Sequence, residues 1–207
     1  MYIPAAFQDD DIASIHAAIR GTRLANLVTM TAEGLMATPI PLILETDEGP
    51  RGVLYGHVAR ANPQWRAAPI GAAMAIFMGP DAYVSPSWYA TKAETGKVVP
   101  TWNYVTVHAT GPVEYFEDSG RLLDIVTRLT NRHEASQASP WKVSDAPESN
   151  LRSQLRGIVG LRLPITRLEG KRKLSQNRSS EDRAGVIEGL GASQDPLDRA
   201  IAGLVPK

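Results

Sequence analysis

The sequence predicts a mainly β protein with flanking helices, as a β-barrel or an α+β architecture. One amphipathic helical segment comes first, a run of segments with the two-residue periodicity of strands follows, and further helical segments come last. The chain lacks the regular strand–helix alternation that builds a doubly wound parallel sheet. We therefore expect a single domain over residues 1–207, with a C-terminal helical extension over about residues 179–207.

The first helix is predicted directly after three aspartates. Asp9–Asp11 supply an N-cap and place negative charge at the positive end of the helix dipole. Gly21 follows the last apolar position and ends the helix. The residues at helical spacing are Ile12, Ile15, His16 and Ile19. His16 is more simply explained as a residue on this apolar face than as a ligand.

Four strands are predicted in the next part of the chain. They are Leu24–Met30, Met36–Leu44, Val53–His57 and Ala72–Met78. Pro39 and Pro41 have no N–H group to donate, so the second strand is expected at a sheet edge or around a bulge. A short helix from Asn62 to Ala67 precedes the fourth strand, which is nearly all apolar and is expected to be buried.

The segment from Gly79 to Val99 combines glycine and proline with aromatic residues, which predicts a long loop. Long loops in compact domains are usually functional. The segments Trp102–Thr110 and Pro112–Phe116 are then predicted to form a hairpin around Gly111.

The remaining segments follow with clear periodicity. We expect helices over Ser119–Arg132 and Leu151–Arg156, strands over Ile158–Ile165 and Arg167–Leu174, and terminal helices over Ser179–Glu188 and Pro196–Leu204. The polar segment Ser136–Ser149 is expected to be a surface loop.

Composition excludes several protein classes. The 207 residues are 43% hydrophobic and 21% charged, which is ordinary for a globular protein and excludes disordered and collagen-like chains. Without cysteine there is no disulfide, thiolate nucleophile or iron–sulfur cluster. No apolar run is long enough for a membrane span and no signal peptide is evident, so a cytoplasmic location and no membrane partner are expected.

The net charge of zero conceals a basic segment. Residues 1–150 have a net charge of −5, residues 151–183 of +6, and residues 184–207 of −1. This segment is expected to face nucleic acid, a ligand phosphate or the acidic remainder of the protein.

Familiar catalytic and metal motifs are absent. The Gly189–Gly191 pair of glycines follows no predicted strand, and there is no phosphate loop, HExxH motif or GxSxG elbow. The four histidines have no metal-ligand spacing, so no metal site is expected and the catalytic residues are unknown.

An aromatic-rich stretch between residues 79 and 104 is the first candidate for a ligand site. It contains Tyr83, Trp88, Tyr89, Trp102 and Tyr104. Small polar and basic residues alternate with these rings, and a similar mixture occurs upstream, between His57 and Trp65. A planar, phosphorylated cofactor needs aromatic faces for its ring and cationic or hydroxyl groups for its phosphate. A tryptophan-rich structural loop is the alternative.

The second candidate is the stretch LEGKRKLSQNR, residues 168–178. If it forms a strand, Lys171 and Lys173 share one face and Arg172 takes the other. Phosphate or nucleic-acid binding is one interpretation, and a solvated basic surface is the other.

Five motifs resemble one known family along nearly the whole chain. They are MYIPAAF (1–7), HVARANPQW (57–65), GPDAYVSPSWY (79–89), KVVPTWNYVTVHATG (97–111) and LEGKRKLSQNR (168–178). The resemblance is to the PaiB-type FMN-binding negative transcriptional regulators, a branch of the flavin-binding split-barrel proteins. It implies a split β-barrel homodimer with FMN at the subunit interface.

The resemblance also implies where FMN would bind. Leu27, Val28, Thr29 and Met30 would lie along the isoalloxazine edge, with Arg60 and Asn62 near the ribityl phosphate. His57 would position that end or serve only as a hydrogen-bonding residue at the end of its strand. Trp88, Lys97, Trp102 and Asn103 would close the site from the partner subunit, and Lys171, Leu174, Gln176 and Asn177 would complete its lid.

Three functions remain open at this point. The first is an FMN-binding transcriptional regulator that contacts DNA through the basic segment 151–183, although no basic recognition helix is visible. The second is a flavin-dependent oxidoreductase or flavin reductase, with His57, His108 and Tyr104 as titratable candidates. The third is a flavin-binding or storage module without activity of its own.

Overall fold

The computed structural model describes residues 1–207 and divides them into two compact units. Unit 1 comprises residues 1–18, 78–107 and 169–207, and unit 2 comprises residues 19–77 and 108–168. The boundaries between the units fall within α1 (Ile12–Gly21), β6 (Ala73–Val84), β7 (Thr101–Gly111) and β10 (Arg167–Lys173). Each unit is described by itself.

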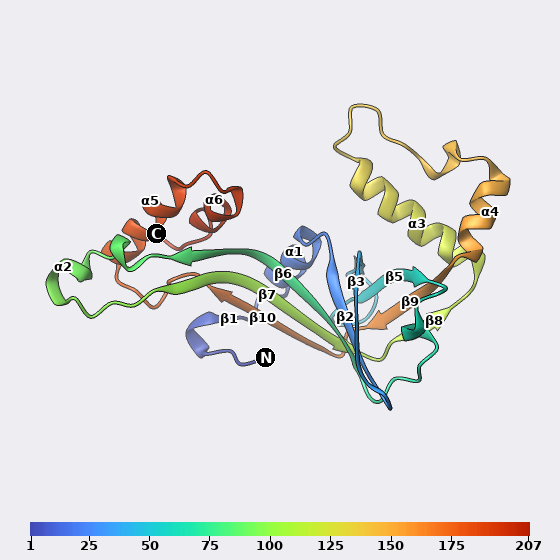
Figure 1. Cartoon of the computed structure of the whole chain (residues 1–207), viewed down its shortest axis with the longest axis horizontal. Coiled ribbons are helices and arrows are strands. Elements are labelled where there is room, and N and C mark those ends of the chain that lie inside the picture. The colour runs from blue at the N-terminus through green and yellow to red at the C-terminus, as the bar shows by residue number, and fades with distance from the viewer. The chain divides into compact units, whose positions relative to one another are not determined.

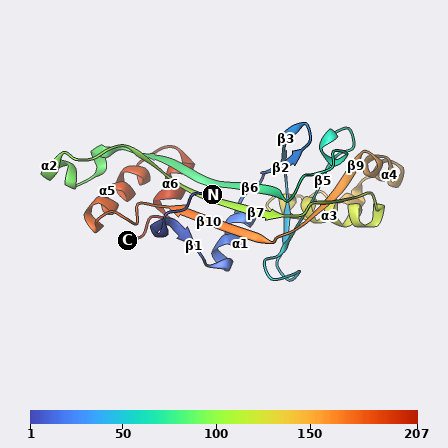
Figure 2. The same ribbon diagram turned by 90° about the horizontal axis from the view of Figure 1, so that it is seen from below.

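Unit 1 is a sheet with helices packed against one face (Figures 1 and 2). Its strands lie in the order β1 (Gln8–Asp9), β10, β7 and β6. Strand β1 pairs antiparallel with β10, with Gln8 opposite Lys171 and Asp9 opposite Gly170. The other elements are η1 (Ala5–Phe7), η3 (Pro86–Trp88), α2 (Thr91–Thr95), α5 (Ser180–Gly191) and α6 (Pro196–Ala202).

The core of unit 1 lies between this sheet and the C-terminal helices. Ala82, Val84 and Val105 of the strands pack against the side chains of α5 and α6, including Val186 and Ile201, which are both fully buried. Both C-terminal helices predicted from the sequence are present, and they complete this core. Asp182 of α5 is buried and accepts hydrogen bonds from the Thr91 N–H (3.0 Å) and hydroxyl (2.9 Å), which fixes α2 to α5.

Unit 2 contains two groups of antiparallel strands. The first half of β6 pairs with β2 (Ala25–Thr31), and β2 pairs with β3 (Gly34–Ile40). The second group has the order β4 (Ile43–Glu45), β5 (Val53–Ala59), β9 (Ile158–Pro164) and β8 (Glu114–Phe116). The other elements are η2 (Pro63–Trp65), α3 (Ser119–Glu134), η4 (Val143–Asp145) and α4 (Glu148–Arg156).

Helix α3 covers the second group of strands (Figure 1). Its buried residues Ile125 and Leu129 pack with Ile43 of β4, and Tyr55 and Phe116 border this cluster. Asp118 caps the helix by accepting a hydrogen bond from the N–H of Arg121 (2.8 Å). The predicted apolar periodicity of this helix is therefore confirmed.

The predicted strand over residues 36–44 is two strands. Strand β3 ends at Ile40 and β4 begins at Ile43, and the two lie in different sheets. Pro41 stands at the break, where a residue without an N–H group costs no ladder hydrogen bond. The expected edge position is confirmed, because β3 and β4 each end the strand order of their sheet.

Two further sequence predictions are wrong. The expected loop over residues 79–99 is largely structured, because β6 continues to Val84 and is followed by η3 and α2. Gly79 is part of this strand and lets it pass close to β7, because a Cβ at this position would be only 3.2 Å from the Val105 side chain. The expected hairpin around Gly111 is absent, since β7 and β8 lie in different sheets and β8 pairs with β9.

Candidate functional site

The sheet of unit 1 has one face that no helix covers. Strand β7 alternates between buried Asn103 and Val105, on the side of the C-terminal helices, and the more exposed Trp102 and Tyr104. Lysine amines from β10 and the ring of Tyr2 lie on the second side. We name this surface the basic aromatic face. Its members are Tyr2, Tyr83, Trp102, Tyr104, Lys171 and Lys173.

Lys171 is a buried cation between two aromatic rings. Its amine lies 5.2 Å from the ring centre of Tyr104 and 5.7 Å from that of Tyr2, and it donates a hydrogen bond to the Tyr2 carbonyl oxygen (3.2 Å). Only 8% of the residue is exposed, and no carboxylate pairs with the amine. A buried ammonium without a counter-charge is costly, so an anionic ligand here would relieve an existing penalty.

Lys173 lies two residues further along the same face. Its amine donates hydrogen bonds to the Thr101 hydroxyl and to the Trp102 carbonyl oxygen (2.7 Å). Burial lowers the pKa of the Lys173 amine, and the nearby charges of Lys171 and Arg178 lower it further. The accumulated positive charge that lowers this pKa also favours an anion in the same place.

Arg172 takes the opposite side of β10, as predicted. Its guanidinium donates a hydrogen bond to the Ser14 hydroxyl (3.1 Å) and lies 3.8 Å from the Asp9 carboxylate. The alternation of Lys171, Arg172 and Lys173 is therefore confirmed. Of the three cations, only Arg172 has a carboxylate partner.

Exposed aromatic rings complete the basic aromatic face. Trp102 is 52% exposed and Tyr83 is 46% exposed, and their rings meet edge to face with centres 6.0 Å apart. Exposed rings beside lysine amines that have no carboxylate partner can hold a planar ligand that carries a phosphate. This donor set fits FMN, whose ring system is planar and whose ribityl chain ends in a phosphate.

The other predicted residues of unit 1 have structural contacts. Asn103 is buried and hydrogen-bonded to the Ser175 hydroxyl (3.0 Å), and Leu174 belongs to the core. Gln176 accepts a hydrogen bond from the N–H of Leu174 (2.6 Å) and thereby shapes the turn after β10. Lys97 and Asn177 are exposed.

Trp88 packs against the C-terminal helix α5. A Cβ on Gly189 would be 2.4 Å from the Trp88 ring, and a Cβ on Gly185 would be 1.9 Å from its carbonyl oxygen. The contact with Trp88 therefore requires glycine at both helical positions.

The predicted residues of β2 alternate between the core and the surface of unit 2. Leu27 and Thr29 are buried, Val28 is half-buried and Met30 is 46% exposed. The Thr29 hydroxyl accepts a hydrogen bond from the side chain of Gln64 (3.0 Å). Of these four residues, Val28 and Met30 can offer side chains to a ligand at this surface.

Asn62 and Gln64 form a polar network beneath β2 and β3. The Asn62 carboxamide donates to the Thr38 hydroxyl (2.9 Å) and caps η2 by accepting from the N–H of Gln64 (2.9 Å). Gln64 is 1% exposed and donates to the carbonyl oxygen of Leu27 (3.1 Å). This network fixes the geometry of both strands.

Arg60 is held by three groups of unit 2. Its Nε donates to the carbonyl oxygen of Arg156 (2.6 Å), its Nη2 donates to that of Ile158 (3.3 Å), and Nη1 forms an ion pair with Glu117. The guanidinium is thus fixed in position, with some of its N–H groups left to bind a further ligand.

His57 has a buried ring nitrogen without a partner. It lies on β5 opposite Gly160, and Nδ1 makes no hydrogen bond. Burial lowers the pKa of the His57 imidazole below its ordinary value of 6.5. The folded protein therefore favours the neutral ring.

This shift gives a testable pH dependence. The stability that neutral His57 provides is present above pH 6.5 and is lost as the pH falls below it towards the folded-state pKa, because unfolding releases the ring to take up a proton. Urea midpoints measured at pH 8 and pH 5 should differ less for His57→Gln than for the wild type. An identical pH dependence in both proteins would contradict this role for His57.

The two remaining titratable candidates are on β7. Tyr104 is on the basic aromatic face and His108 is half-buried further along the strand. No group of three His, Asp or Glu side chains is placed to hold a metal ion.

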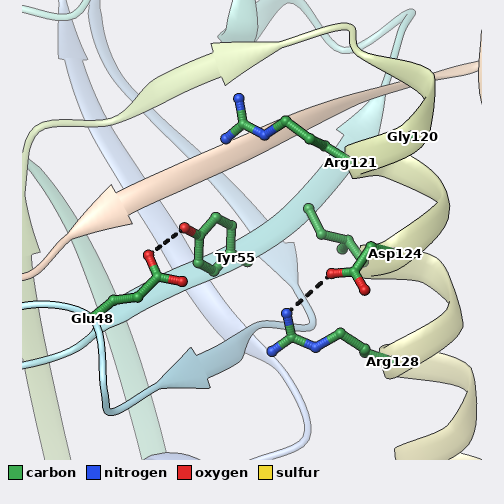
Figure 3. A pocket seen from close by; sticks show the side chains of 7 residues that line it. Glu48, Tyr55, Gly120, Arg121, Asp124 and Arg128 are labelled. Atoms are coloured by element: carbon green, nitrogen blue, oxygen red, sulfur yellow. Dashed lines mark hydrogen bonds and ion pairs between the residues drawn. The ribbon is translucent and has the colours of Figure 1, made fainter.

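A separate cavity lies between the strands of unit 2 and α3 (Figure 3). It measures about 350 Å³ and contains none of the residues predicted to bind FMN. Its charged groups are largely paired, since Tyr55 donates to the Glu48 carboxylate (2.6 Å) and Arg128 pairs with Asp124 (3.2 Å). This pairing leaves little unsatisfied charge for a ligand.

Comparison with known proteins assigns the family. Residues 1–167 match the family described as "Putative FMN-binding domain". The chain belongs to this family. FMN is therefore its cofactor, as predicted, and both the domain and its donor set point to a flavoprotein.

Individual relatives extend the similarity over the whole chain. The chain is 31% identical to "Protease synthase and sporulation protein PAI 2" of Bacillus subtilis, over 99% of this chain and 96% of that protein. It is 35% identical to the uncharacterized protein AN0679 of Emericella nidulans, with the same coverage. The resemblance to PaiB-type proteins is confirmed.

A solved structure supports the fold. The FAD and heme binding protein of Mycobacterium smegmatis aligns with a TM-score of 0.59 at 16% identity, over 86% of this chain and 78% of that chain. The predicted fold class is confirmed, with mainly antiparallel sheets and flanking helices in a split-barrel fold. No helix of the chain is long and apolar enough to cross a membrane.

Tyr83, Tyr104 and Lys173 belonged to the two candidate stretches of the sequence, but they and Tyr2 were not among the residues that the resemblance assigned to FMN. Tyr2 and Lys173 lie within the first and last of the five family motifs, and Tyr83 lies in the third. Alternation along a strand could have identified Lys173, because residues two positions apart lie on the same face and Lys171 was already assigned to the site. Tyr83 was part of the aromatic candidate stretch, but because its segment was predicted to be a loop, its position on a strand beside Trp102 was not predicted.

Proposed function

We propose that this protein is an FMN-dependent negative transcriptional regulator of the PaiB type. The observation that supports this most strongly is 31% identity along nearly the whole chain to PAI 2, whose name refers to protease synthase and sporulation. Control of other genes accounts for that name more directly than turnover of one substrate. The family supplies the cofactor, and the regulatory role is our proposal.

In this proposal FMN lies on the basic aromatic face. The Lys171 amine binds the phosphate, because it is a buried cation that lacks a counter-charge. Trp102 and Tyr83 offer exposed ring surface to the flavin. FMN supplies redox chemistry when bound, and the residues of this chain bind and orient it.

We further propose that the protein is a homodimer that associates through the outer face of β2 and β3. Val28 lies opposite Ala37 and Met30 lies opposite Leu35, so four apolar side chains stand side by side. Leu35 is 69% exposed. The partner we propose is a second copy of the chain, because a contiguous apolar face at a sheet edge is suited to an identical face.

A charge on this face tests the dimer. Leu35→Glu should convert the dimer into a monomer, because pairing the two faces would bury the new carboxylate. Light scattering after size exclusion measures the mass. Leu24→Glu is the control, since Leu24 is also exposed (56%) but precedes β2. A monomeric wild type, or a Leu35→Glu variant that stays dimeric, would contradict this interface.

DNA binding tests the regulatory function. The FMN-loaded protein is incubated with a random double-stranded library, and enriched sequences are measured by fluorescence anisotropy at several salt concentrations. We expect one preferred site, bound about 1000-fold or more tightly than bulk DNA, with affinity that depends on bound FMN. Binding without sequence preference would reject the regulator, and steady oxidation of NADH or NADPH would favour the alternative oxidoreductase.

The basic segment 151–183 is divided between the two units. Arg152 and Arg156 are on α4 in unit 2, whereas Lys171, Arg172 and Lys173 are on β10 in unit 1. In our proposal the lysines serve FMN. Any contribution of this segment to DNA binding must then come from its other cations.

A further inference from the structure

A second cavity of unit 2 lies between α3 and the segment that contains η4 and α4. Helix α3 packs against both of these elements, and Figure 1 shows the connection that leads from α3 to α4. The cavity measures about 460 Å³ and is lined by residues of all three elements. It shares no lining residue with the basic aromatic face or with the cavity in Figure 3. Cavities of roughly 300 to 1000 Å³ hold small organic ligands.

Helix α3 directs a separate stripe of side chains to this cavity. Leu123, Thr127 and Asn131 are four residues apart, so they lie on one side of the helix, and all three line the cavity. Ile125 and Leu129, in contrast, are buried against the strands. Leu123 remains 37% exposed. The cavity therefore retains apolar surface that the protein itself does not cover.

The opposite wall of the cavity is also apolar. It is formed by Val143 of η4, which is 7% exposed, and by Leu151 of α4, which is half-buried. Together with Leu123 these side chains give the cavity three apolar contacts from three different elements. Such a lining favours the hydrocarbon part of a ligand, because apolar surface is removed from water on binding.

Two polar side chains of the lining have no partner in the protein. The Lys142 amine makes no hydrogen bond or ion pair, although the Lys142 backbone N–H donates to the Asp145 carboxylate (2.9 Å). The Asn131 carboxamide likewise makes no hydrogen bond. Lys142 is the one cation among the lining residues, and no carboxylate lines the cavity. The charge of the lining is therefore complementary to a ligand with a single negative charge.

We propose that this cavity binds a small monocarboxylic acid with an apolar body. The carboxylate pairs with the Lys142 amine and accepts a hydrogen bond from Asn131, and the apolar body lies against Leu123, Val143 and Leu151. A phosphate monoester fits less well, because a second negative charge finds no second cation. This site is separate from the flavin site and does not rest on the proposed regulatory function.

Titration of the FMN-loaded, ¹⁵N-labelled protein with benzoate tests the site. The ionic strength is kept constant with chloride. We expect saturable shifts of the Thr127 and Val143 amides, which lie on opposite walls of the cavity. Benzamide has the same ring without the charge and should bind about tenfold more weakly, because it cannot form the ion pair.

Two substitutions separate the charge from the apolar wall. Lys142→Gln should raise the dissociation constant for benzoate about tenfold and leave that for benzamide within about twofold of the wild type. Leu123→Gln should weaken both ligands about fivefold, because both place the same ring against this side chain. Lys92→Gln is the matched control, since Lys92 is an exposed lysine of unit 1 and should leave both affinities unchanged.

Four results would overturn the proposal. They are shifts that grow linearly without saturation, benzamide binding as tight as benzoate binding, a Lys142→Gln variant that binds benzoate like the wild type, and shifts centred on Trp102 and Tyr104 instead of the cavity. The last would place benzoate on the basic aromatic face. Because the amides of the cavity report binding directly, failure of this site is distinguishable from failure of FMN binding or of DNA binding.

Discussion

Replacing Lys171 with methionine should weaken FMN binding roughly tenfold to a hundredfold, which corresponds to the loss of one charge-assisted hydrogen bond. The amine has no carboxylate partner, so its charge is available to the flavin phosphate. Methionine fills the space between the Tyr2 and Tyr104 rings and makes favourable contacts with them, so the fold should be retained. Quenching of FMN fluorescence at fixed ionic strength measures the dissociation constant.

The neighbouring arginine provides the control for this prediction. Arg172 is next in sequence but lies on the opposite side of β10, where it contacts Ser14 and Asp9. Arg172→Met should therefore leave FMN affinity within about twofold of the wild type, since no direct contact is removed. Equal losses in both variants would indicate a general charge effect, and an unchanged affinity in Lys171→Met would remove Lys171 from the flavin site.

Adding one methyl group at Gly185 should destabilise the protein by about 3 kcal/mol or more. A Cβ at this position would lie 1.9 Å from the carbonyl oxygen of Trp88 and 3.1 Å from its carbonyl carbon. These are backbone atoms, so relief requires α5 to move away from Trp88 and the core of unit 1 to open. The measurement is the urea midpoint of Gly185→Ala against the wild type.

Gly191 in the same helix is the matched control. A Cβ there would meet nothing within 4 Å, so Gly191→Ala should be neutral or should stabilise the helix by up to about 1 kcal/mol. If Gly185→Ala were as stable as Gly191→Ala, the contact between α5 and Trp88 would not be part of the folded protein.

Much of the fold was predictable because apolar periodicity fixes the elements individually. Helix α3 and strand β10 were both predicted to within about two residues at each end, since their patterns are regular. Pairing between strands was not predictable from such patterns. Strands β7 and β8 were predicted to form a hairpin, but β8 pairs with β9. Gly111, the expected turn, instead lies against the Pro164 backbone at the end of β9.

The sequence predicted the chemistry of the candidate site better than it predicted which residues form it. The alternation of Lys171 and Arg172 on one strand followed from strand geometry alone. In contrast, nothing in the sequence distinguished Trp102, which is exposed, from Asn103, which is buried against Ser175. The position of Tyr83 on β6 was not predicted because glycine and proline nearby indicated a loop, whereas Gly79 lets β6 approach Val105 closely.

The most direct test of the account is a crystal structure of the protein bound to FMN. We predict density for the ring system against Trp102 and Tyr83, with the phosphate within hydrogen-bond distance of the Lys171 amine. Flavin density on other residues, with Lys171 still facing only the Tyr2 carbonyl oxygen and the two rings, would contradict the account.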